Sequence, residues 1–518
     1  MTRPSVFGRR SRFWSRPDWL GGHADLIILG IVVLVAAVVR LAFALRVPVF
    51  VTKDTLEYVE PALTLLAGGP LELAQRRTPV YPLFIAGSVS LFGPELLAIT
   101  FAQHLLGVGT AALAYTIGRL TFGRVAGLIG GLLAGLSGPL LIYEHYLITE
   151  PIFAFLLVGS VCLFVAGLRT ERRLLIVLGG VALGLAALTR PVGQAVLVVL
   201  PFAFLAHYRA WRPTLQACAL AVAGFALLVV PWAIRNQVVY GTAGAASVGR
   251  FLISRSVKHE RNFVFYEPAV GAQPDEPVER TRARQIAQDV TNKRPEPGQI
   301  FQRVRDELGL TEAQTDAMLK DIALEAIMRN PSLWAQGTVE MFFELVQGAP
   351  KEESVRWHLD QHNQPRVANQ WGGLAYLLSP PTPAQSRELD AAEDLARVFR
   401  PTRHERSLIA FFLLGTLVAL LRPRARAALL PALVVLVLLA ASAALVGDVP
   451  RYRYPIDPLL YAVAAGGVTS LIGLALAIAR RSSYLAGQVR GARRGARRAP
   501  FGPTAGRPAE LPGAGATH

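Results

Sequence analysis

The sequence predicts an all-α polytopic membrane protein, folded as a bundle of about ten transmembrane helices. Hydrophobic residues make up 52% of its 518 residues and the mean hydropathy is +0.39, which is too apolar for a soluble protein of this length. Several apolar runs approach or exceed the roughly 20 residues that a helix needs to cross a bilayer. These runs lack the alternating pattern of barrel strands, so we expect helices.

The spans and their direction follow from the apolar runs and from the arginines between them. We expect membrane-spanning helices over residues 25–46, 95–118, 125–142, 151–168, 174–189, 194–206, 214–232, 407–421, 428–446 and 459–479. Arginines gather in alternate connections, so the positive-inside rule places these connections and both termini in the cytoplasm. The net charge of +17 therefore indicates topology and contact with anionic lipids, and not nucleic-acid binding.

This topology divides the chain into five parts. They are a basic cytoplasmic tail (1–24), a transmembrane core (25–234) with outer loops at 47–94 and 143–150, an external, periplasmic insertion (235–406), C-terminal transmembrane helices (407–479) and a tail predicted to be disordered (480–518). The Arg- and Ala-rich, Lys-poor composition is typical of a bacterium with a GC-rich genome. The membrane would then be the bacterial plasma (inner) membrane.

Short apolar segments outside the spans are expected to be amphipathic or interfacial helices. Tyr81–Phe92 is too short to cross the bilayer and is predicted to lie in the outer interface. The insertion shows helical patterns at 311–327 and 333–346. The second of these would lie against the outer leaflet, cap a site, or bury its apolar face in the external domain.

Some residues within the spans suggest chemistry but are better explained by packing. Cys162 and Cys218 are expected to be small apolar packing residues, with no disulfide or metal site. Gly107 and Gly109 superficially resemble a dinucleotide fingerprint, yet they lie in an apolar span without a preceding strand. His104 is interpreted as an interhelical hydrogen-bond partner.

Acidic residues of the two first outer loops are the candidate catalytic groups. Asp54 lies a few residues beyond the first span, and Glu144, His145 and Glu150 occupy the second outer loop. Glu150 also fits the first turn of a helix capped by Thr149, where the helix dipole favours a carboxylate. Acidic groups at membrane depth are costly and are usually functional, so we keep both interpretations of Glu150.

Arginines of the later outer loops are candidate phosphate ligands. Arg190 precedes a proline between two spans, and Arg451 and Arg453 alternate with tyrosines before the last span. Arginine and tyrosine at an interface also form anchoring belts. We favour phosphate binding for at least one of Arg451 and Arg453, because the guanidinium group binds phosphate in a bidentate manner.

The order of these motifs resembles the bacterial GT-C membrane glycosyltransferases, which are similar to dolichyl-phosphate-mannose protein mannosyltransferases and lipid A aminoarabinose transferases. The motifs are Asp54-x-x-x-Tyr58, Gly68-Gly69, Arg77-x-Pro-x-Tyr81-Pro82, Thr149-Glu150, Arg190-Pro191, Pro231-Trp-x-x-Arg-Asn236 and Arg451-Tyr-Arg-Tyr454-Pro455. They are scattered over about 25–460 and exclude most of the insertion. The resemblance implies transfer of a sugar from a polyprenyl-phosphate donor to a glycan, lipid or protein acceptor on the outer face.

The resemblance also implies roles for individual residues. Asp54 and Glu150 would be the catalytic carboxylates, with Asp54 as general base. Arg77, Arg451 and Arg453 would bind the donor phosphate, while Tyr58, Tyr81, Glu144, His145, Arg190 and Tyr454 would position substrates. Many relatives carry a second acid directly after the first, whereas Thr55 follows Asp54 here, so a divalent cation is left open.

The chemistry agrees with these residue types. A hydroxyl acceptor needs a carboxylate to take its proton, and the leaving phosphate needs arginines or a divalent cation. A single base without a covalent nucleophile implies inversion at the anomeric carbon. The alternatives are a transporter or flippase of lipid-linked sugars and a membrane scaffold whose insertion binds envelope partners. A pocket that joins Asp54, Glu150 and Arg451 or Arg453 would favour the enzyme.

Overall fold

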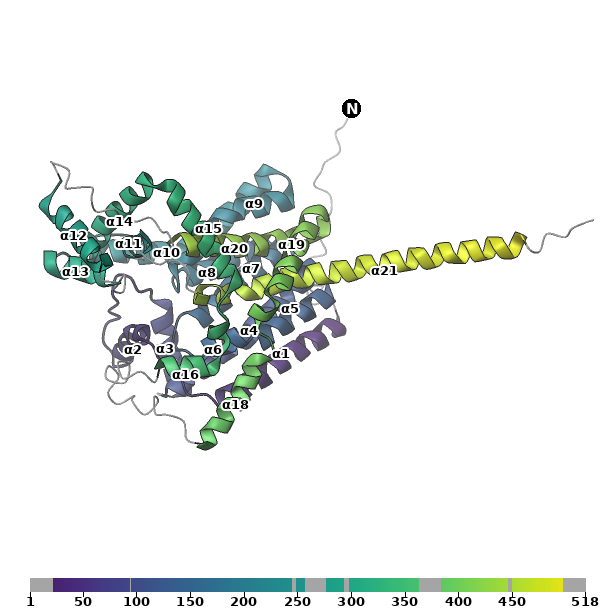
Figure 1. Cartoon of the computed structure of the whole chain (residues 1–518), viewed down its shortest axis with the longest axis horizontal. Coiled ribbons are helices and arrows are strands. Elements are labelled where there is room, and N and C mark those ends of the chain that lie inside the picture. Colours follow the sequence, from purple (N-terminus) through teal and green to yellow (C-terminus); the bar gives the residue numbers. More distant parts are fainter. Residues whose placement is uncertain are drawn as a thin grey trace, which may run out of the picture. The chain divides into compact units, whose positions relative to one another are not determined.

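The protein is a bundle of helices in the part of the chain that the computed structural model describes, which is residues 22–93, 95–244, 248–256, 276–292, 298–362, 383–445 and 450–496 (Figure 1). Within these residues the only β-structure consists of isolated bridges, Phe50 to Tyr146 and Ser137 to Phe399. The chain divides into two units, Met1–Thr469 and Ser470–His518, and the site described below lies in the first.

A helix coincides with each of the ten expected spans. They are α1 (His23–Ala44), α4 (Leu96–Thr121), α5 (Arg124–Leu136), α7 (Glu150–Thr170), α8 (Arg173–Ala187), α9 (Val196–Tyr208), α10 (Trp211–Tyr240), α19 (Glu405–Leu421), α20 (Leu429–Leu445) and α21 (Asp457–Ala496). Among the described residues, eight helical segments are long and apolar enough to cross a membrane, and α5 and α8 are shorter. The predicted all-α polytopic fold is confirmed.

Small residues bring the bundle helices together. A Cβ atom on Gly180 of α8 would lie 2.1 Å from the carbonyl oxygen of Ala221, and one on Gly224 of α10 would lie 2.2 Å from that of Val177. The two backbones therefore touch, as is typical of helices in membranes. Cys162 is buried among apolar residues of the same core, and both it and Cys218 are free.

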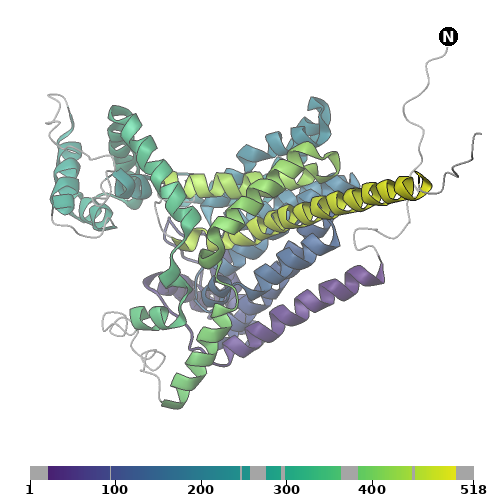
Figure 2. The same cartoon turned by 45° about the vertical axis from the view of Figure 1, so that its right-hand side comes forward.

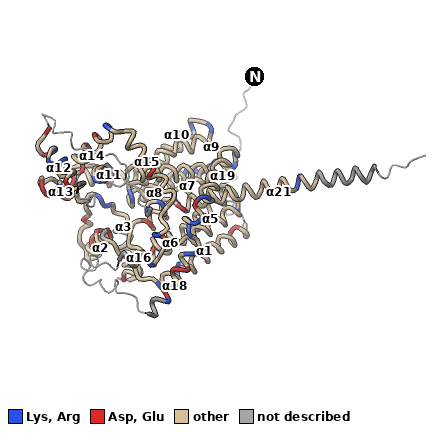
Figure 3. The backbone as a smooth tube through the Cα atoms, in the orientation of Figure 1, with Lys and Arg blue, Asp and Glu red and all other residues tan. Residues whose placement is uncertain are grey.

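Further helices lie at one end of the bundle, where the outer loops are expected (Figures 1 and 2). The first loop contains α2 (Lys53–Leu66) and α3 (Val80–Phe92), and the short α6 (Gly138–Glu144) follows α5. The insertion contributes α11 (Val248–Ser256), α12 (Val278–Asn292), α13 (Gly298–Leu308), α14 (Glu312–Arg329), α15 (Pro331–Gln347), α16 (Val355–His362) and α18 (Pro383–Arg397). Many of the charged residues lie on these helices (Figure 3).

The helix α15 joins the insertion to the bundle. Leu333 and Trp334, in its first turn, pack against the small core formed by α11 to α14. Met341 and Leu345, two turns later, belong to the core of the bundle itself. The apolar face of α15 is thus divided between the insertion and the bundle, an arrangement that the sequence patterns did not separate.

One expected irregular segment is helical. The chain after Arg480 was predicted to be disordered, but α21 continues to Ala496. Its Ala, Arg, Leu and Gln residues are good helix formers, which outweighs the few glycines over this stretch. The remaining parts of the two predicted tails, 1–21 and 497–518, lie outside the described residues.

Candidate active site

The first outer loop presents Asp54 at the start of a helix. Thr52 caps α2, and its backbone N–H donates to Thr55 Oγ1 over 2.9 Å in a capping box. Asp54 therefore occupies the first helical turn, where the helix dipole favours a negative charge. The sequence Thr-Lys-Asp-Thr thus sets both the start of α2 and the direction of this carboxylate.

The two first outer loops are bonded to each other. Phe50 N–H donates to the carbonyl of His145 over 3.1 Å, and Leu147 N–H donates to the carbonyl of Phe50 over 3.1 Å. The fully buried hydroxyl of Thr55 donates to the Leu147 carbonyl over 3.0 Å. These bonds hold the loop that carries Asp54 against the loop that leads to Glu150.

The connection after α8, which contains Leu188 and Thr189, is bonded to the segment between α2 and α3. Thr78 Oγ1 donates to the carbonyl of Thr189 over 2.9 Å, and Val80 N–H donates to that of Leu188 over 3.3 Å. The neighbours of these residues, Arg77 and Arg190, are thereby fixed on the same side of the bundle. Three connections that are distant in sequence therefore meet at one place.

A cavity of about 380 Å³ opens where these connections meet. It is lined by Asp54, Tyr58, Arg76, Arg77, Thr78, Ile148, Thr149, Glu150, Thr189, Arg190, Pro191, Val192, Gln194, Gly244, Val248, Phe251, Ser442, Leu445, Arg451 and Tyr452. Asp54, Glu150 and Arg451 thus share one cavity, the arrangement that favours an enzyme over the alternatives.

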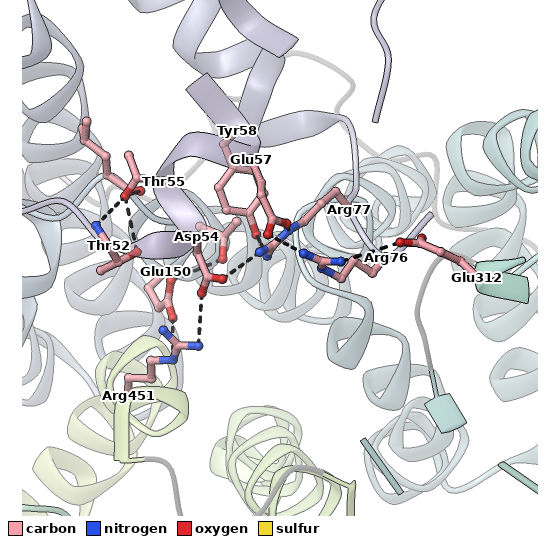
Figure 4. A network of polar contacts seen from close by, with 12 residues as sticks. Thr52, Asp54, Thr55, Glu57, Tyr58, Arg76, Arg77, Glu150, Glu312 and Arg451 are labelled. Atoms are coloured by element: carbon pink, nitrogen blue, oxygen red, sulfur yellow. Dashed lines mark hydrogen bonds and ion pairs between the residues drawn. The ribbon is translucent and has the colours of Figure 1, made fainter. Parts of the chain in front are cut away.

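Asp54 is paired with two arginines at unequal distances (Figure 4). Its Oδ1 accepts from Arg77 Nη2 over 2.7 Å, and its Oδ2 lies 3.6 Å from Arg451 Nη2. Burial raises the pKa of Asp54, but Arg77, Arg451 and Arg76 outweigh burial and hold that pKa below its ordinary value. The carboxylate is therefore ionised and able to accept a proton at neutral pH.

Glu150 faces the same cavity from the start of α7. Its Oε1 lies 2.6 Å from Arg190 Nη1 and 3.7 Å from Arg451 Nε. Arg451 consequently lies between the two carboxylates and bridges them. Glu150 is in the first turn of α7, which agrees with its interpretation as a helix-start residue. It also lines the cavity, which agrees with a functional role.

The residues of the connection before α21 alternate between two environments. Arg451 and Tyr452 line the cavity, and the Tyr452 ring lies under the guanidinium carbon of Arg190 at 4.4 Å. Arg453 is buried, pairs with Asp457 at 3.1 Å and donates to the carbonyl of Val346. Arg453 therefore stands outside the cavity that we predicted it to line.

Tyr454, predicted to position substrate, is also buried outside this cavity, with its ring against Tyr143 at 5.2 Å. Tyr81 is fully buried as well, and its hydroxyl donates to Gln103 over 2.8 Å. Gln103 in turn donates to the carbonyls of Glu144 and Tyr146 over 2.9 and 2.7 Å. Tyr81 thus supports the second outer loop and does not face the cavity.

Glu144 and His145 belong to a separate buried network. Glu144 pairs with Arg40 at 2.7 Å and with His104 at 3.0 Å, and His104 contacts His145 at 3.0 Å. Burial lowers the pKa of His145 to about 3, so this ring is neutral. A Cβ atom on Gly107 would lie 2.2 Å from Glu144, so this glycine makes room for the network. His104 is an interhelical partner, as expected.

Sequence reasoning missed three side chains at the cavity or beside it. Glu57 pairs with Arg76 and, at 2.6 Å, with Arg77, and Tyr452 lies against Arg190. Glu57 lies three residues after Asp54, a spacing that places both on one helix face and could have indicated it. Arg76 and Tyr452 adjoin predicted residues, and only the tertiary structure shows which neighbour faces inward.

The residues around Asp54 do not resemble a carboxylate pair for a divalent cation. The hydroxyl of Thr55 is directed to Leu147 and away from the cavity. Glu57, the next acid on α2, is engaged by Arg76 and Arg77. Across the described ranges, no group of three or more His, Cys, Asp or Glu residues is placed to hold a metal ion.

The fold and the cavity define a polytopic helical membrane protein with an arginine- and carboxylate-lined site. The sequence profile of the family described as dolichyl-phosphate-mannose-protein mannosyltransferase matches residues 51–241. The resemblance inferred from the motifs is thereby confirmed over the segment that supplies Asp54, Arg77, Glu150 and Arg190. Comparison with curated proteins finds no match.

The solved structures that are similar to this chain at low identity include the following two. The archaeal oligosaccharyltransferase AglB from Archaeoglobus fulgidus, in complex with an inhibitory peptide and a dolichol-phosphate, is 15% identical, with 90% of this chain and 52% of that chain covered and a TM-score of 0.45. ArnT from Cupriavidus metallidurans, bound to undecaprenyl phosphate, is 18% identical, with 86% and 78% covered and a TM-score of 0.39. The chain thus spans about half the length of the archaeal enzyme.

Proposed function

We propose that this protein is a membrane glycosyltransferase. It moves a sugar from a polyprenyl-phosphate carrier to a hydroxyl group of a glycan, lipid or protein on the outer face of the membrane. The observation that carries the proposal is the single cavity in which Asp54 and Glu150 face Arg190 and Arg451. The family match over residues 51–241 supports the same class of reaction.

The cavity supplies a base for the acceptor. In the proposed step the acceptor oxygen attacks the anomeric carbon, and the bond from that carbon to the phosphate oxygen breaks. The hydroxyl proton passes to Asp54, whose Oδ2 lacks the short bond that Oδ1 makes to Arg77. Because one displacement occurs without a covalent nucleophile, the configuration at the anomeric carbon inverts.

The cavity also supplies a cation for the leaving group. Arg451 lies 3.6 and 3.7 Å from its two carboxylates, distances longer than a hydrogen bond. Its guanidinium group is therefore the one best placed to turn to an incoming phosphate, which it would bind in a bidentate manner. Glu150 holds Arg190 and orients Arg451. A chelator titration tests the divalent cation that the resemblance leaves open.

A deletion strain tests the reaction in the cell. Mass spectrometry of envelope glycans, lipids and proteins should reveal a missing sugar and its attachment point. Complementation with the wild type should restore the sugar, and Asp54→Asn should not, because losing a general base costs on the order of 10²–10⁴ in rate. Glu60→Gln is the matched control, since Glu60 is an exposed carboxylate on the same helix. An unchanged envelope in the deletion strain would refute the proposal.

An assay in detergent separates the enzyme from a transporter. A detergent micelle does not separate two compartments, so translocation of a lipid by a flippase cannot be measured in it. An enzyme still transfers the sugar to the acceptor under these conditions. The purified protein, with the donor lipid and acceptor identified in the deletion strain, should release polyprenyl phosphate in stoichiometric amounts with product. Absence of transfer, together with translocation of the same lipid in liposomes, would favour the flippase.

A further inference from the structure

Every nitrogen of the Arg77 guanidinium group has a partner on α2 (Figure 4). Nε donates to Glu57 Oε2 over 2.6 Å, Nη1 donates to the Tyr58 hydroxyl over 2.6 Å, and Nη2 donates to Asp54 Oδ1 over 2.7 Å. The guanidinium carbon also lies 4.6 Å from the centre of the Tyr58 ring. Three of the five N–H donors of Arg77 are therefore directed at one helix.

The spacing along α2 produces this arrangement. Asp54, Glu57 and Tyr58 stand at positions i, i+3 and i+4, which lie on one face of a helix. Arg77 comes from the segment after α2, and the bond from Thr78 to the carbonyl of Thr189 holds that segment against the bundle. The three partners are thus in place without any ligand in the cavity.

Arg77 and Arg451 differ in how firmly they are held. Three bonds of 2.6–2.7 Å hold the Arg77 guanidinium group against α2, so this group could turn to an incoming phosphate only by breaking them. At Arg451 the phosphate would displace ion pairs of 3.6 and 3.7 Å, beside the contact of that arginine with the Tyr452 ring. The resemblance grouped both as phosphate ligands, but their surroundings suit them to separate tasks.

We propose that Arg77 is the fixed counter-cation of Asp54, a positioning residue that Glu57 and Tyr58 hold in place, and that it does not bind the donor phosphate. The inference rests on the proposed function insofar as Asp54 is the base. Arg77 ties down Oδ1 of Asp54 and so leaves Oδ2 to take the proton from the acceptor. Its charge keeps Asp54 ionised in a partly buried site.

The charged groups around Asp54 support this role. Arg77, Arg451 and Arg76 face its carboxylate, and together they outweigh burial, which alone would raise the pKa of Asp54. Tyr58, Glu150, Arg190 and Tyr452 are the other titratable groups that line the cavity, and Glu57 lies on the adjoining face of α2. Since Arg77 makes the one short ion pair with Asp54, removing its charge should raise the pKa of Asp54 most.

Carbodiimide labelling of the full chain in detergent measures this pKa directly, because the reagent reacts with protonated carboxyl groups. Peptide mass spectrometry would follow labelling of Asp54 against pH. In Arg77→Gln the midpoint should rise by about 1–3 pH units, the usual effect of a neighbouring opposite charge. In Arg77→Lys, which keeps the charge but loses the fork, the midpoint should stay closer to that of the wild type.

Transfer kinetics supply the second readout. Arg77→Gln and Arg77→Lys should lower kcat with the donor KM unchanged, whereas Arg451→Gln should raise the donor KM. An unchanged labelling midpoint in Arg77→Gln, or a raised donor KM with kcat retained, would overturn the inference. A wild-type protein that shows no transfer refutes the proposed function alone, because the labelling midpoint still reports on Arg77 and Asp54.

Discussion

At the scale of single residues, the connection before the last helix shows how neighbours of identical type acquire different surroundings. Arg451 lies between Asp54 and Glu150 in the cavity. Arg453, two positions later, is buried and bonded to Asp457 and to the end of α15. The first lines the cavity, where the proposed function has it bind the donor phosphate, and the second secures the start of α21.

This difference predicts separate effects for the two arginines. Arg451→Lys should raise the donor KM and Arg451→Ala should raise it further, by about one to two orders of magnitude, because charge-assisted hydrogen bonds contribute roughly 1.5–3 kcal/mol each. Arg453→Met should instead destabilise the protein by about 3–5 kcal/mol, since Asp457 would be left as an unpaired buried charge. Donor kinetics and thermal unfolding in detergent would measure both.

The opposite pattern would contradict this assignment. If Arg453→Met retained its unfolding temperature and raised the donor KM, while Arg451→Ala left the donor KM unchanged, Arg453 would be the phosphate ligand and Arg451 an anchor of the loop. Arg453→Lys is the matched control, because it keeps the charge beside Asp457.

The sequence indicated the chemistry at this scale better than the directions of side chains. Asp54, Glu150, Arg190 and Arg451 were predicted from residue type and from their side of the membrane, and the cavity contains all four. Tyr81, Tyr454, Glu144, His145 and Arg453 were predicted from the same motifs and lie outside it. Side chains in loops and at the ends of short helices have no sustained periodic pattern, so only their contacts decide whether they face a cavity.

At the scale of elements, the site depends on bonds between connections and not on any one helix. Thr55 illustrates this, because its buried hydroxyl accepts from Thr52 and donates to Leu147. It therefore fastens the start of α2 to the second outer loop. The position that carries a second acid in many relatives serves here to hold the loops together.

Thr55→Val should therefore impair both folding and activity. The substitution keeps the shape but leaves the Thr52 N–H and the Leu147 carbonyl without their partner, at about 1–3 kcal/mol for each unsatisfied group. Asp54, the next residue, should lose its orientation, so kcat should fall with the donor KM little changed. Thr55→Ser retains the hydroxyl and should behave like the wild type. Equal stability and kcat for the two variants would contradict this role.

Hydropathy and arginine placement were sufficient to locate the elements of the bundle. All ten expected spans coincide with helices, and Tyr81–Phe92 forms the short helix α3. The sequence patterns did not identify α2, which Thr52 and Thr55 start within a polar loop. They also did not show that α15 divides its apolar face between two cores. Periodicity indicates which face of a helix is buried, but it does not indicate which part of the protein covers that face.

At the scale of the whole molecule, the number of membrane-spanning helices determines whether the two termini lie on the same side of the membrane. If α5 and α8 cross together with the eight longer segments, the chain crosses ten times and both termini lie on one side. Arginine placement predicts that this side is the cytoplasm. A reporter fused at Gly309, between α13 and α14, should be active only outside the cytoplasm, and one at the C-terminus only inside. Cytoplasmic activity at Gly309 would invert the site and the proposed function with it.

The position of Arg451 between two carboxylates also bears on how the reaction cycle ends. A sugar-linked lipid phosphate is a diester with one negative charge, and the released lipid phosphate is a monoester that carries up to two near neutral pH. The same arginine should therefore hold the spent carrier more tightly than the donor, and inhibition by added polyprenyl phosphate should grow with pH through its second ionisation. In the proposed reaction, Asp54 and Glu150 should compete with the carrier for Arg451 and so speed its release. Glu150→Gln should then slow release of the lipid phosphate and strengthen its inhibition of transfer.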